Sequence, residues 1–198
     1  MDRIIIHWTA GGHRANATDR RSYHRLIEGD GRVVPGNLAP EANRSVADGI
    51  YAPHTRALNT GSIGVALCAM HMAQERPFNP GPAPITPAQL TSLAREVSDL
   101  CATYRIPVTR RTVLTHAEVQ RTLGVAQAGK WDIVWLPGMQ APGDPIEIGD
   151  RLRAMIEAPA LPIPAPAPAA PSPDDPAALI AEATALLHRA RAALNPGA

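Results

Sequence analysis

The chain has 198 residues with a formal net charge of +1, and 45% of its residues are hydrophobic. This charge balance leaves no electrostatic footprint for nucleic acid or anionic lipid, and no run approaches the ~18 apolar residues of a membrane span. We therefore expect no nucleic-acid partner and no stable membrane insertion.

The N-terminus and the two cysteines bear on where the protein folds. The three isoleucines at residues 4–6 are too few for the apolar core of a signal peptide, so we expect synthesis in the cytoplasm. Cys68 lies in an apolar run and Cys101 on the apolar side of a predicted helix. These positions favour two buried free thiols over a disulfide.

The first third of the chain predicts a buried strand and a hairpin. Residues 3–9 are mostly β-branched or apolar around His7, and two glycines follow them, which is typical of a short buried strand. Residues 12–21 are polar and basic, with room for at most one or two helical turns. Two apolar alternations then flank Gly29-Asp30-Gly31, a strong hairpin signal, and Tyr23 stands at the start of the first.

The middle of the chain predicts a second buried strand after a loop. Residues 37–59 are expected to form this loop, which carries His54. Residues 61–70 are almost continuously apolar, and this pattern predicts a strand that is covered on both faces.

Two helices and a third strand complete the expected elements. Thr86, Pro87 and Gln89 have the spacing of an N-cap, a first helical residue and the closing residue of a capping box. An amphipathic helix should therefore run from this point to Tyr104. The remaining elements are a strand over residues 111–116 that ends in His116, and a last helix over residues 146–157.

From residue 158 the composition changes, which places a domain boundary after residues 1–157. Eight of the 21 prolines lie between Pro159 and Pro176, mostly alternating with alanine, so residues 158–174 are expected to form an extended Pro/Ala-rich linker. Residues 175–195 then predict one amphipathic, Ala- and Leu-rich helix. At about twenty residues it would be marginal alone, so we expect it to pack on a second copy, a partner or the parent domain, with self-association favoured.

Residues 116–132 contain an imidazole, an ammonium and a carboxylate that could act in catalysis. Lys130 is the only lysine among nineteen basic residues, and it stands two positions before Asp132. An ammonium is a compact donor for a developing oxyanion. His116, Asp132 and His7 together would supply the His and carboxylate ligands of a hydrolytic zinc site, although seven histidines allow other triples, and a satisfied His beside a surface Lys–Asp pair is the simpler alternative.

Five segments in order resemble a known family. They are residues 4–10 (Ile-Ile-Ile-His-Trp-Thr-Ala), residues 23–33 with Tyr-His and Asp-Gly-Arg-Val, residues 59–65 with Asn and Ser-Ile-Gly-Val, residues 116–118 (His-Ala-Glu) and residues 130–132 (Lys-Trp-Asp). Together they resemble the zinc-dependent N-acetylmuramoyl-L-alanine amidases of the phage-lysozyme and peptidoglycan-recognition-protein family. The resemblance covers about residues 3–157. It implies an α/β fold with a mixed central sheet flanked by helices, a zinc ion, and hydrolysis of the amide between the lactyl group of N-acetylmuramic acid and L-alanine.

The resemblance also implies roles for individual residues. His7, His116 and Asp132 match the zinc ligands, and Tyr23 and Lys130 match the catalytic tyrosine and lysine. Lys130 would donate to the oxyanion, and Tyr23 would orient water or assist proton transfer.

Two further residues are candidates for substrate contact. His54 falls where members often carry a groove histidine, and Trp131 beside the site could stack on sugar. Packing roles remain open for both, as for Tyr23. Glu118 is expected to start a helix or support a ligand rather than to catalyse.

Departures from the family pattern bear on the groove and on the function. The interval from His7 to Tyr23 is short, which would open one wall of the groove. Ala66 stands where cytoplasmic recycling relatives carry a glutamate, which favours the phage-type machinery. The expected function is therefore a phage or prophage endolysin that waits in the cytoplasm and acts on the cell wall after release. A binding-only peptidoglycan-recognition module and a cytoplasmic muropeptide-recycling amidase are the alternatives.

Overall fold

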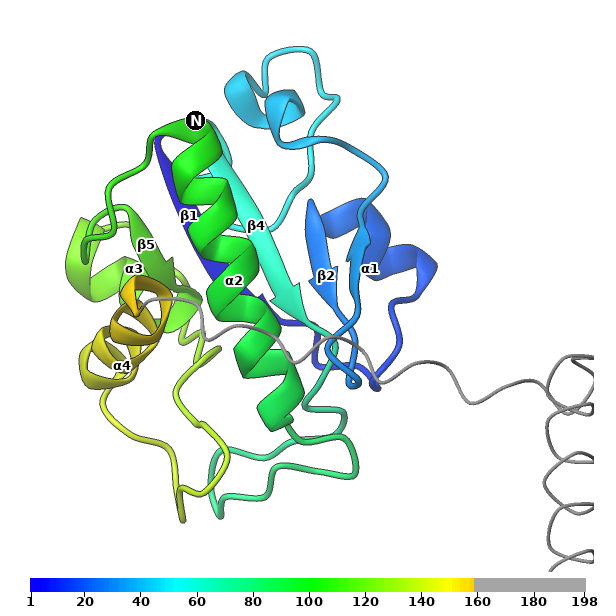
Figure 1. Cartoon of the computed structure of the whole chain (residues 1–198), viewed down its shortest axis with the longest axis vertical. Coiled ribbons are helices and arrows are strands. Elements are labelled where there is room, and N and C mark those ends of the chain that lie inside the picture. Colours follow the sequence, from blue (N-terminus) through cyan, green and yellow to red (C-terminus); the bar gives the residue numbers. More distant parts are fainter. Residues whose placement is uncertain (159–198) are drawn as a thin grey trace, which may run out of the picture. The chain divides into compact units, whose positions relative to one another are not determined.

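The computed structural model describes residues 1–158, and its centre is a five-stranded sheet in the order β3-β2-β4-β1-β5 (Figure 1). β2 and β3 form an antiparallel hairpin, whereas β1 pairs in parallel with both β4 and β5, and β2 pairs in parallel with β4. The sheet is therefore mixed, as the family resemblance implies. The strands are β1 (Arg3–Trp8), β2 (Arg25–Ile27), β3 (Val33–Pro35), β4 (Ser62–Leu67) and β5 (Val113–Thr115).

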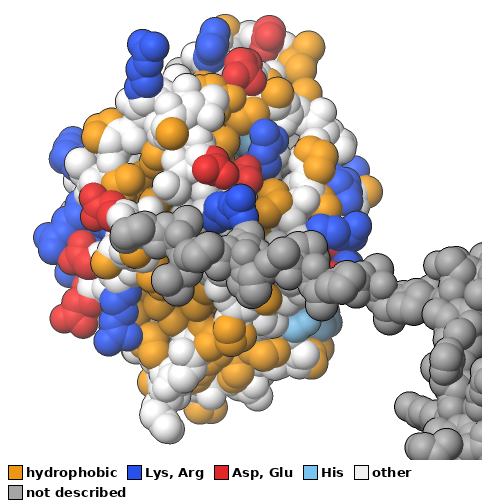
Figure 2. Space-filling model, in the orientation of Figure 1, with side chains coloured by type: hydrophobic (Ala, Val, Ile, Leu, Met, Phe, Trp, Pro, Cys, Tyr) orange, Lys and Arg blue, Asp and Glu red, His pale blue; other side chains and the backbone are white. Residues whose placement is uncertain are grey.

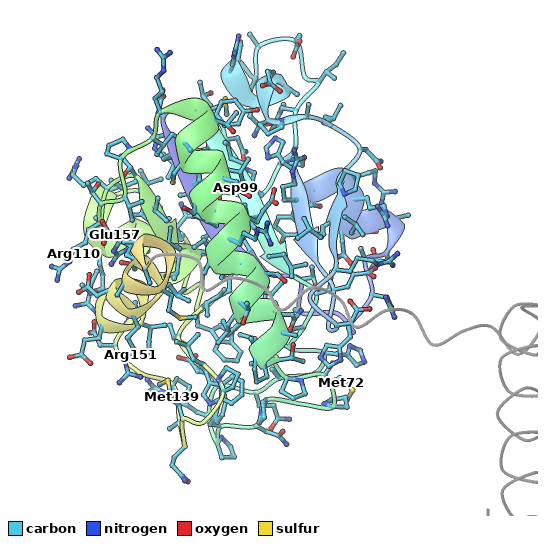
Figure 3. All side chains as sticks on the ribbon, in the orientation of Figure 1. Met72, Asp99, Arg110, Met139, Arg151 and Glu157 are labelled. Atoms are coloured by element: carbon cyan, nitrogen blue, oxygen red, sulfur yellow. The ribbon has the colours of Figure 1, made fainter. Side chains whose placement is uncertain are left out.

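Two helices cover one face of the sheet. In Figure 1, α2 (Pro87–Tyr104) crosses in front of β1 and β4, and α4 (Pro145–Glu157) lies beside it. The predicted capping box of α2 is confirmed, because Thr86 Oγ1 accepts from Gln89 N and Gln89 Oε1 accepts from Thr86 N. The outer sides of both helices are polar, as the exposed Asp99 and Arg151 in Figure 3 illustrate.

The other face carries shorter elements. These are α1 (Ala17–Ser22) and α3 (His116–Leu123), whereas the 3₁₀ helix η1 (Pro40–Arg44) lies against β4 and the end of α2, where Glu41 accepts from Tyr104 Oη at 2.6 Å. α1 is the one or two turns that the polar segment before Tyr23 predicts. η1 lies inside the segment expected to be loop, where Pro40 at its first turn favours a short helix.

Alternation along β1 decides which face each side chain takes. Ile4 and Ile6 belong to the larger core cluster, which includes residues of α2 and α4, whereas Ile5 packs with Val119 of α3. Successive strand side chains point to opposite faces, so His7 shares the face of Ile5. The core is mainly aliphatic, with Trp8 and Trp135 as its buried aromatic members, and both Cys68 and Cys101 are free and buried, as expected.

The third strand ends earlier than predicted. β5 stops at Thr115, and His116 is the first residue of α3 instead of the last residue of a strand. The reason is local: the Glu118 carboxylate accepts from Thr115 N at 2.8 Å and closes a capping box that starts the helix. Glu118 is thus a helix-starting carboxylate, as expected.

The surface carries charges of both signs. Figure 2 shows acidic and basic side chains mixed over the face that it draws, in keeping with the balanced charge. Among the described residues no helix is long and apolar enough to cross a membrane. Beyond Ala158, the expected linker and the expected helix over residues 175–195 lie outside the described residues.

Candidate metal centre

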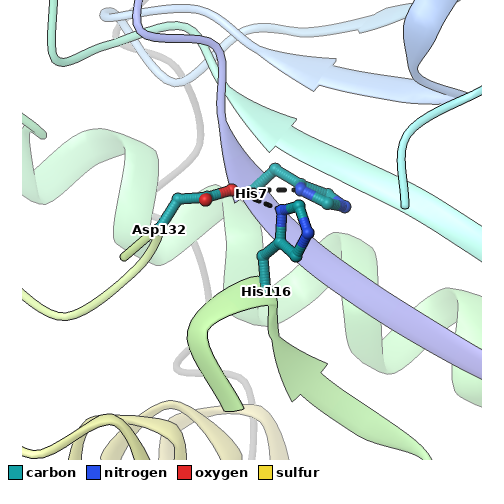
Figure 4. A group of neighbouring side chains, drawn as sticks. All are labelled: His7, His116 and Asp132. Carbon is teal, nitrogen blue, oxygen red and sulfur yellow. Dashed lines mark hydrogen bonds and ion pairs between the residues drawn. The ribbon is translucent and has the colours of Figure 1, made fainter. Parts of the chain in front are cut away.

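Three buried side chains converge where the sheet meets α3 (Figure 4). His7 comes from β1, His116 from the first turn of α3 and Asp132 from the loop that follows. Asp132 Oδ2 lies 3.1 Å from His7 Nδ1 and 3.1 Å from His116 Nδ1. The two imidazole centroids are 4.6 Å apart. These three residues form a group that could hold a metal ion.

Strand pairing brings the two histidines together. β1 and β5 are parallel, with Ile6 opposite Thr115, so the residues that follow each of them lie side by side at the same end of the two strands. His7 and His116 are those residues. Asp132 is fixed by a backbone hydrogen bond, since Ala117 N donates to Asp132 O at 2.6 Å. The free N–H groups of the first helical turn thus anchor the loop that brings the carboxylate.

Each histidine is also held at its far nitrogen. His116 Nε2 lies 2.8 Å from Gln127 Oε1. His7 Nε2 lies 3.2 Å from His54 Nδ1, and His54 Nε2 lies 3.3 Å from the carbonyl oxygen of Ser62. A carbonyl can only accept, so His54 Nε2 donates and His54 Nδ1 is left as an acceptor for the His7 Nε2–H.

Burial and hydrogen bonding set the charges of this group. Burial lowers the pKa of His7 to about 4, against the raising effect of Asp132, so the ring is neutral at pH 7. Burial alone would raise the pKa of Asp132, but the neighbouring imidazoles of His116 and His7 outweigh it and hold this pKa below its usual range. Asp132 is therefore an anion that faces two imidazole nitrogens.

The other predicted site residues surround this group at different depths. The ring centroids of Tyr23 and His7 are 5.1 Å apart. Burial raises the pKa of the Tyr23 phenol, which is therefore protonated at neutral pH. Lys130 is exposed, and its charge contributes to lowering the pKa of His7. Trp131 is half-buried and packs edge-to-face on Trp8, with the two ring centroids 4.7 Å apart. His54 is buried, and protein atoms lie at hydrogen-bonding distance from both of its nitrogens.

Two supporting residues were missed by the sequence reasoning. Gln127 contacts His116, and the buried His24 lies near His54, with ring centroids 5.6 Å apart. His24 is itself held by Asn43 Oδ1 at 3.1 Å and by Gly64 N at 2.9 Å. The one available signal for Gln127 is that it is the only polar side chain between Gly124 and Lys130.

Comparison with protein families gives a match over most of the described chain. Residues 1–138 match the family model described as N-acetylmuramoyl-L-alanine amidase. No curated protein matches the chain.

Several solved structures are similar to this chain. The N-acetylmuramoyl-L-alanine amidase LysC from Clostridium intestinale URNW is 16% identical, with a TM-score of 0.43 over 77% of this chain and 83% of its own. AmiD from E. coli, in complex with the substrate anhydro-N-acetylmuramic acid-L-Ala-D-gamma-Glu-L-Lys, is 27% identical, with a TM-score of 0.42 over 59% of this chain and 48% of its own. The Ph2119 endolysin from the Thermus scotoductus MAT2119 bacteriophage Ph2119 is 21% identical, with a TM-score of 0.40 over 65% of this chain and 79% of its own.

Proposed function

Since this chain belongs to the N-acetylmuramoyl-L-alanine amidase family, we propose that it hydrolyses the amide between the lactyl group of N-acetylmuramic acid and L-alanine in peptidoglycan. The observation that carries the proposal is the buried group of His7, His116 and Asp132. Hydrolysis adds the water oxygen to the lactyl carbonyl carbon, breaks the C–N bond and leaves a proton on the alanine nitrogen.

The donor set of this group fits a zinc ion. Two imidazoles and one carboxylate are ligands that catalytic zinc takes, and ~2.0 Å bonds to four ligands would place neighbouring ligand atoms roughly 3.3 Å apart. The two 3.1 Å separations to Asp132 Oδ2 are close to this spacing. A bound zinc ion would lower the pKa of a water molecule toward ~7 and polarise the amide carbonyl.

Two side chains of this protein then assist the reaction. The Lys130 ammonium would donate to the lactyl carbonyl oxygen as negative charge develops there. The Tyr23 phenol stays protonated at neutral pH and lies beside His7, so it would hold the attacking water by a hydrogen bond.

Of the two candidates for substrate contact, Trp131 and His54, the contacts favour only Trp131. Trp131 presents part of an indole beside the ligands, while its edge-to-face contact with Trp8 keeps it in place, and it would stack on a sugar ring. The partners at both nitrogens of His54 favour its support of His7 over direct contact with substrate.

We favour an endolysin role over recycling or recognition alone. All three proposed ligands and both proposed catalytic groups are present, which favours catalysis over binding only. Ala66 pairs with His7 in the parallel register of β4 and β1, so a methyl group occupies the position next to the metal ligand where recycling relatives carry a glutamate. As an endolysin, the protein would act on the cell wall after release from the cytoplasm.

Digestion of purified sacculi tests the activity directly. Mass spectrometry of the products should show free L-alanine amino termini and intact glycan strands, and metal analysis should find zinc near one equivalent. As a matched control, Asp132→Ala should lose both zinc and cleavage. Cleavage within the glycan, or zinc binding without any cleavage, would contradict the proposed function.

A further inference from the structure

Gln127 is a buried side chain that bridges the candidate metal centre to a neighbouring loop. It is 4% exposed, and its Oε1 lies 2.8 Å from His116 Nε2. Its Nε2 lies 3.0 Å from the carbonyl oxygen of Arg56 and 3.4 Å from that of Val125. Every polar atom of the carboxamide is therefore occupied inside the protein.

These contacts fix which end of the carboxamide faces His116. The carbonyl oxygens of Arg56 and Val125 can only accept hydrogen bonds, so the NH₂ end of Gln127 must point to them. The oxygen end then faces His116, and Nε2 of that ring must donate its proton. In this tautomer Nδ1 carries the lone pair, and it lies 3.1 Å from Asp132 Oδ2, so both atoms could bind the same metal ion.

We propose that Gln127 is a positioning residue that selects the Nε2–H tautomer of His116 and so presents Nδ1 as the metal-binding atom. This inference rests on the metal centre of the proposed function. A hydrogen bond to the far nitrogen of a ligand imidazole fixes its tautomer and orientation and raises its basicity toward the metal. Without such an acceptor, the proton can reside on Nδ1, where it blocks ligation.

The backbone of Gln127 also helps to position the turn that carries Lys130. Gln127 N donates to Gln120 Oε1 at 3.0 Å, and Gln127 O accepts from Lys130 N at 3.3 Å. One residue thus ties His116 and the turn that carries Lys130 to the end of α3. Changing the side chain alone should alter metal binding first, because the backbone contacts to Lys130 remain.

Three variants of the full-length protein test this proposal. Gln127→Leu removes the acceptor at similar volume, and Gln127→Glu keeps an acceptor oxygen. Gln89→Leu is the matched control, since Gln89 is also buried and its Nε2 donates to the carbonyl oxygens of Ile27 and Cys68, on the α2 side of the sheet. Zinc affinity would be measured by competition with a chelating indicator, and the histidine tautomers by ¹⁵N NMR of the metal-free protein.

The expected outcomes separate positioning from a purely structural role. Gln127→Leu should weaken zinc binding by about 10- to 100-fold and lose the Nε2–H signature of His116. Gln127→Glu should keep both, and Gln89→Leu should lower thermal stability while zinc affinity stays unchanged. Unchanged zinc affinity in Gln127→Leu, or an equal loss in Gln89→Leu, overturns the proposal and leaves the proposed function standing. A wild-type protein that binds no zinc would remove the metal centre itself.

Discussion

The loop between α3 and α4 carries Lys130 and Asp132, two charges in opposite environments. Asp132 is 7% exposed and faces both histidines, whereas Lys130, two residues earlier, is exposed to solvent. A buried carboxylate of this kind suits ligation, and an ammonium on a flexible stem suits contact with substrate. The two roles can therefore be separated by substitution at single positions.

Replacing Lys130 by Arg tests the oxyanion role. We expect Lys130→Arg to retain zinc but to lower turnover by on the order of 10²-fold, the usual cost of losing one oxyanion donor, because a planar guanidinium cannot take the place of the compact ammonium. Metal content and kcat would be measured with a soluble muropeptide. The reciprocal change Arg95→Lys, on the exposed side of α2, serves as control. Near-wild-type turnover would make Lys130 a surface residue.

Glu28 carries a charge that contributes to folding stability and has no proposed role in the metal centre. Its buried carboxylate accepts from Arg14 at 2.6 Å, from Arg32 at 2.5 Å and from Ala15 N at 3.1 Å. Burial alone would raise the pKa of Glu28, but these hydrogen bonds outweigh it and lower the pKa from its ordinary value of 4.5 to about 2. The group therefore contributes stability above its unfolded pKa, and this contribution is lost as the pH falls toward 2.

Glu28→Gln should reveal this contribution. The variant is expected to lower the free energy of unfolding by about 1–3 kcal/mol at pH 7, with the difference shrinking between pH 4.5 and 2. Urea unfolding over a pH series measures it. The same substitution at the exposed Glu75 should change little. A Glu28→Gln difference that does not depend on pH would show that the carboxylate charge is not the cause.

At the scale of elements, a buried ion pair joins α4 to the start of α3. Arg153 donates to Glu118 Oε1 at 2.8 Å and to Oε2 at 3.2 Å, and it also donates to the carbonyl oxygen of Val113 at 2.8 Å. Glu118 in turn accepts a hydrogen bond from the backbone N–H of Thr115, the residue before His116. The position of one proposed ligand thus depends on an ion pair between its own helix, α3, and α4.

Gly149 makes room for this ion pair, and its substitution tests the connection. A methyl group at Gly149 would overlap the Glu118 carboxylate, which Arg153 and Thr115 hold in place. Ala normally stabilises a helix interior over Gly by about 1 kcal/mol, but here we expect Gly149→Ala to destabilise the protein by about 1–3 kcal/mol.

Thermal or urea unfolding provides the measurement for Gly149→Ala. Ser98→Ala, on the exposed side of α2, is the control and should be neutral or slightly stabilising. If Gly149→Ala raised stability instead, α4 would not be packed against Glu118 as described.

At the scale of the whole molecule, the described residues hold every proposed functional group. All five strands, α1 to α4 and the seven proposed site residues lie within residues 1–158. We therefore expect a chain that ends at residue 158 to fold and to keep its activity on a soluble muropeptide.

Sedimentation and kinetics of this truncation measure the two roles separately. The full-length chain should self-associate through the expected C-terminal helix, and the truncated chain should be monomeric. A truncation that is well folded but inactive would place part of the catalytic function in residues 159–198.

Local sequence patterns determined most of the elements. The apolar runs gave the two central strands, and the Thr86 capping box and its period-3.6 pattern gave α2, because caps and amphipathic faces depend on residues only a few positions apart. The motifs around His7, His116 and Lys130 also identified the family, which the match over residues 1–138 confirms.

Only the tertiary structure decided how distant residues meet. The contact of His7 with Asp132 spans 125 positions, and it depends on the parallel register of β1 with β5 and on one backbone hydrogen bond from Ala117. Arg153 gave no sequence signal of its role, and Gln127 gave only its isolation among apolar residues, because a glutamine in a loop and an arginine in a helix are usually solvated. Such contacts arise from packing between elements, whereas the pattern along each element reports only which side of it is buried.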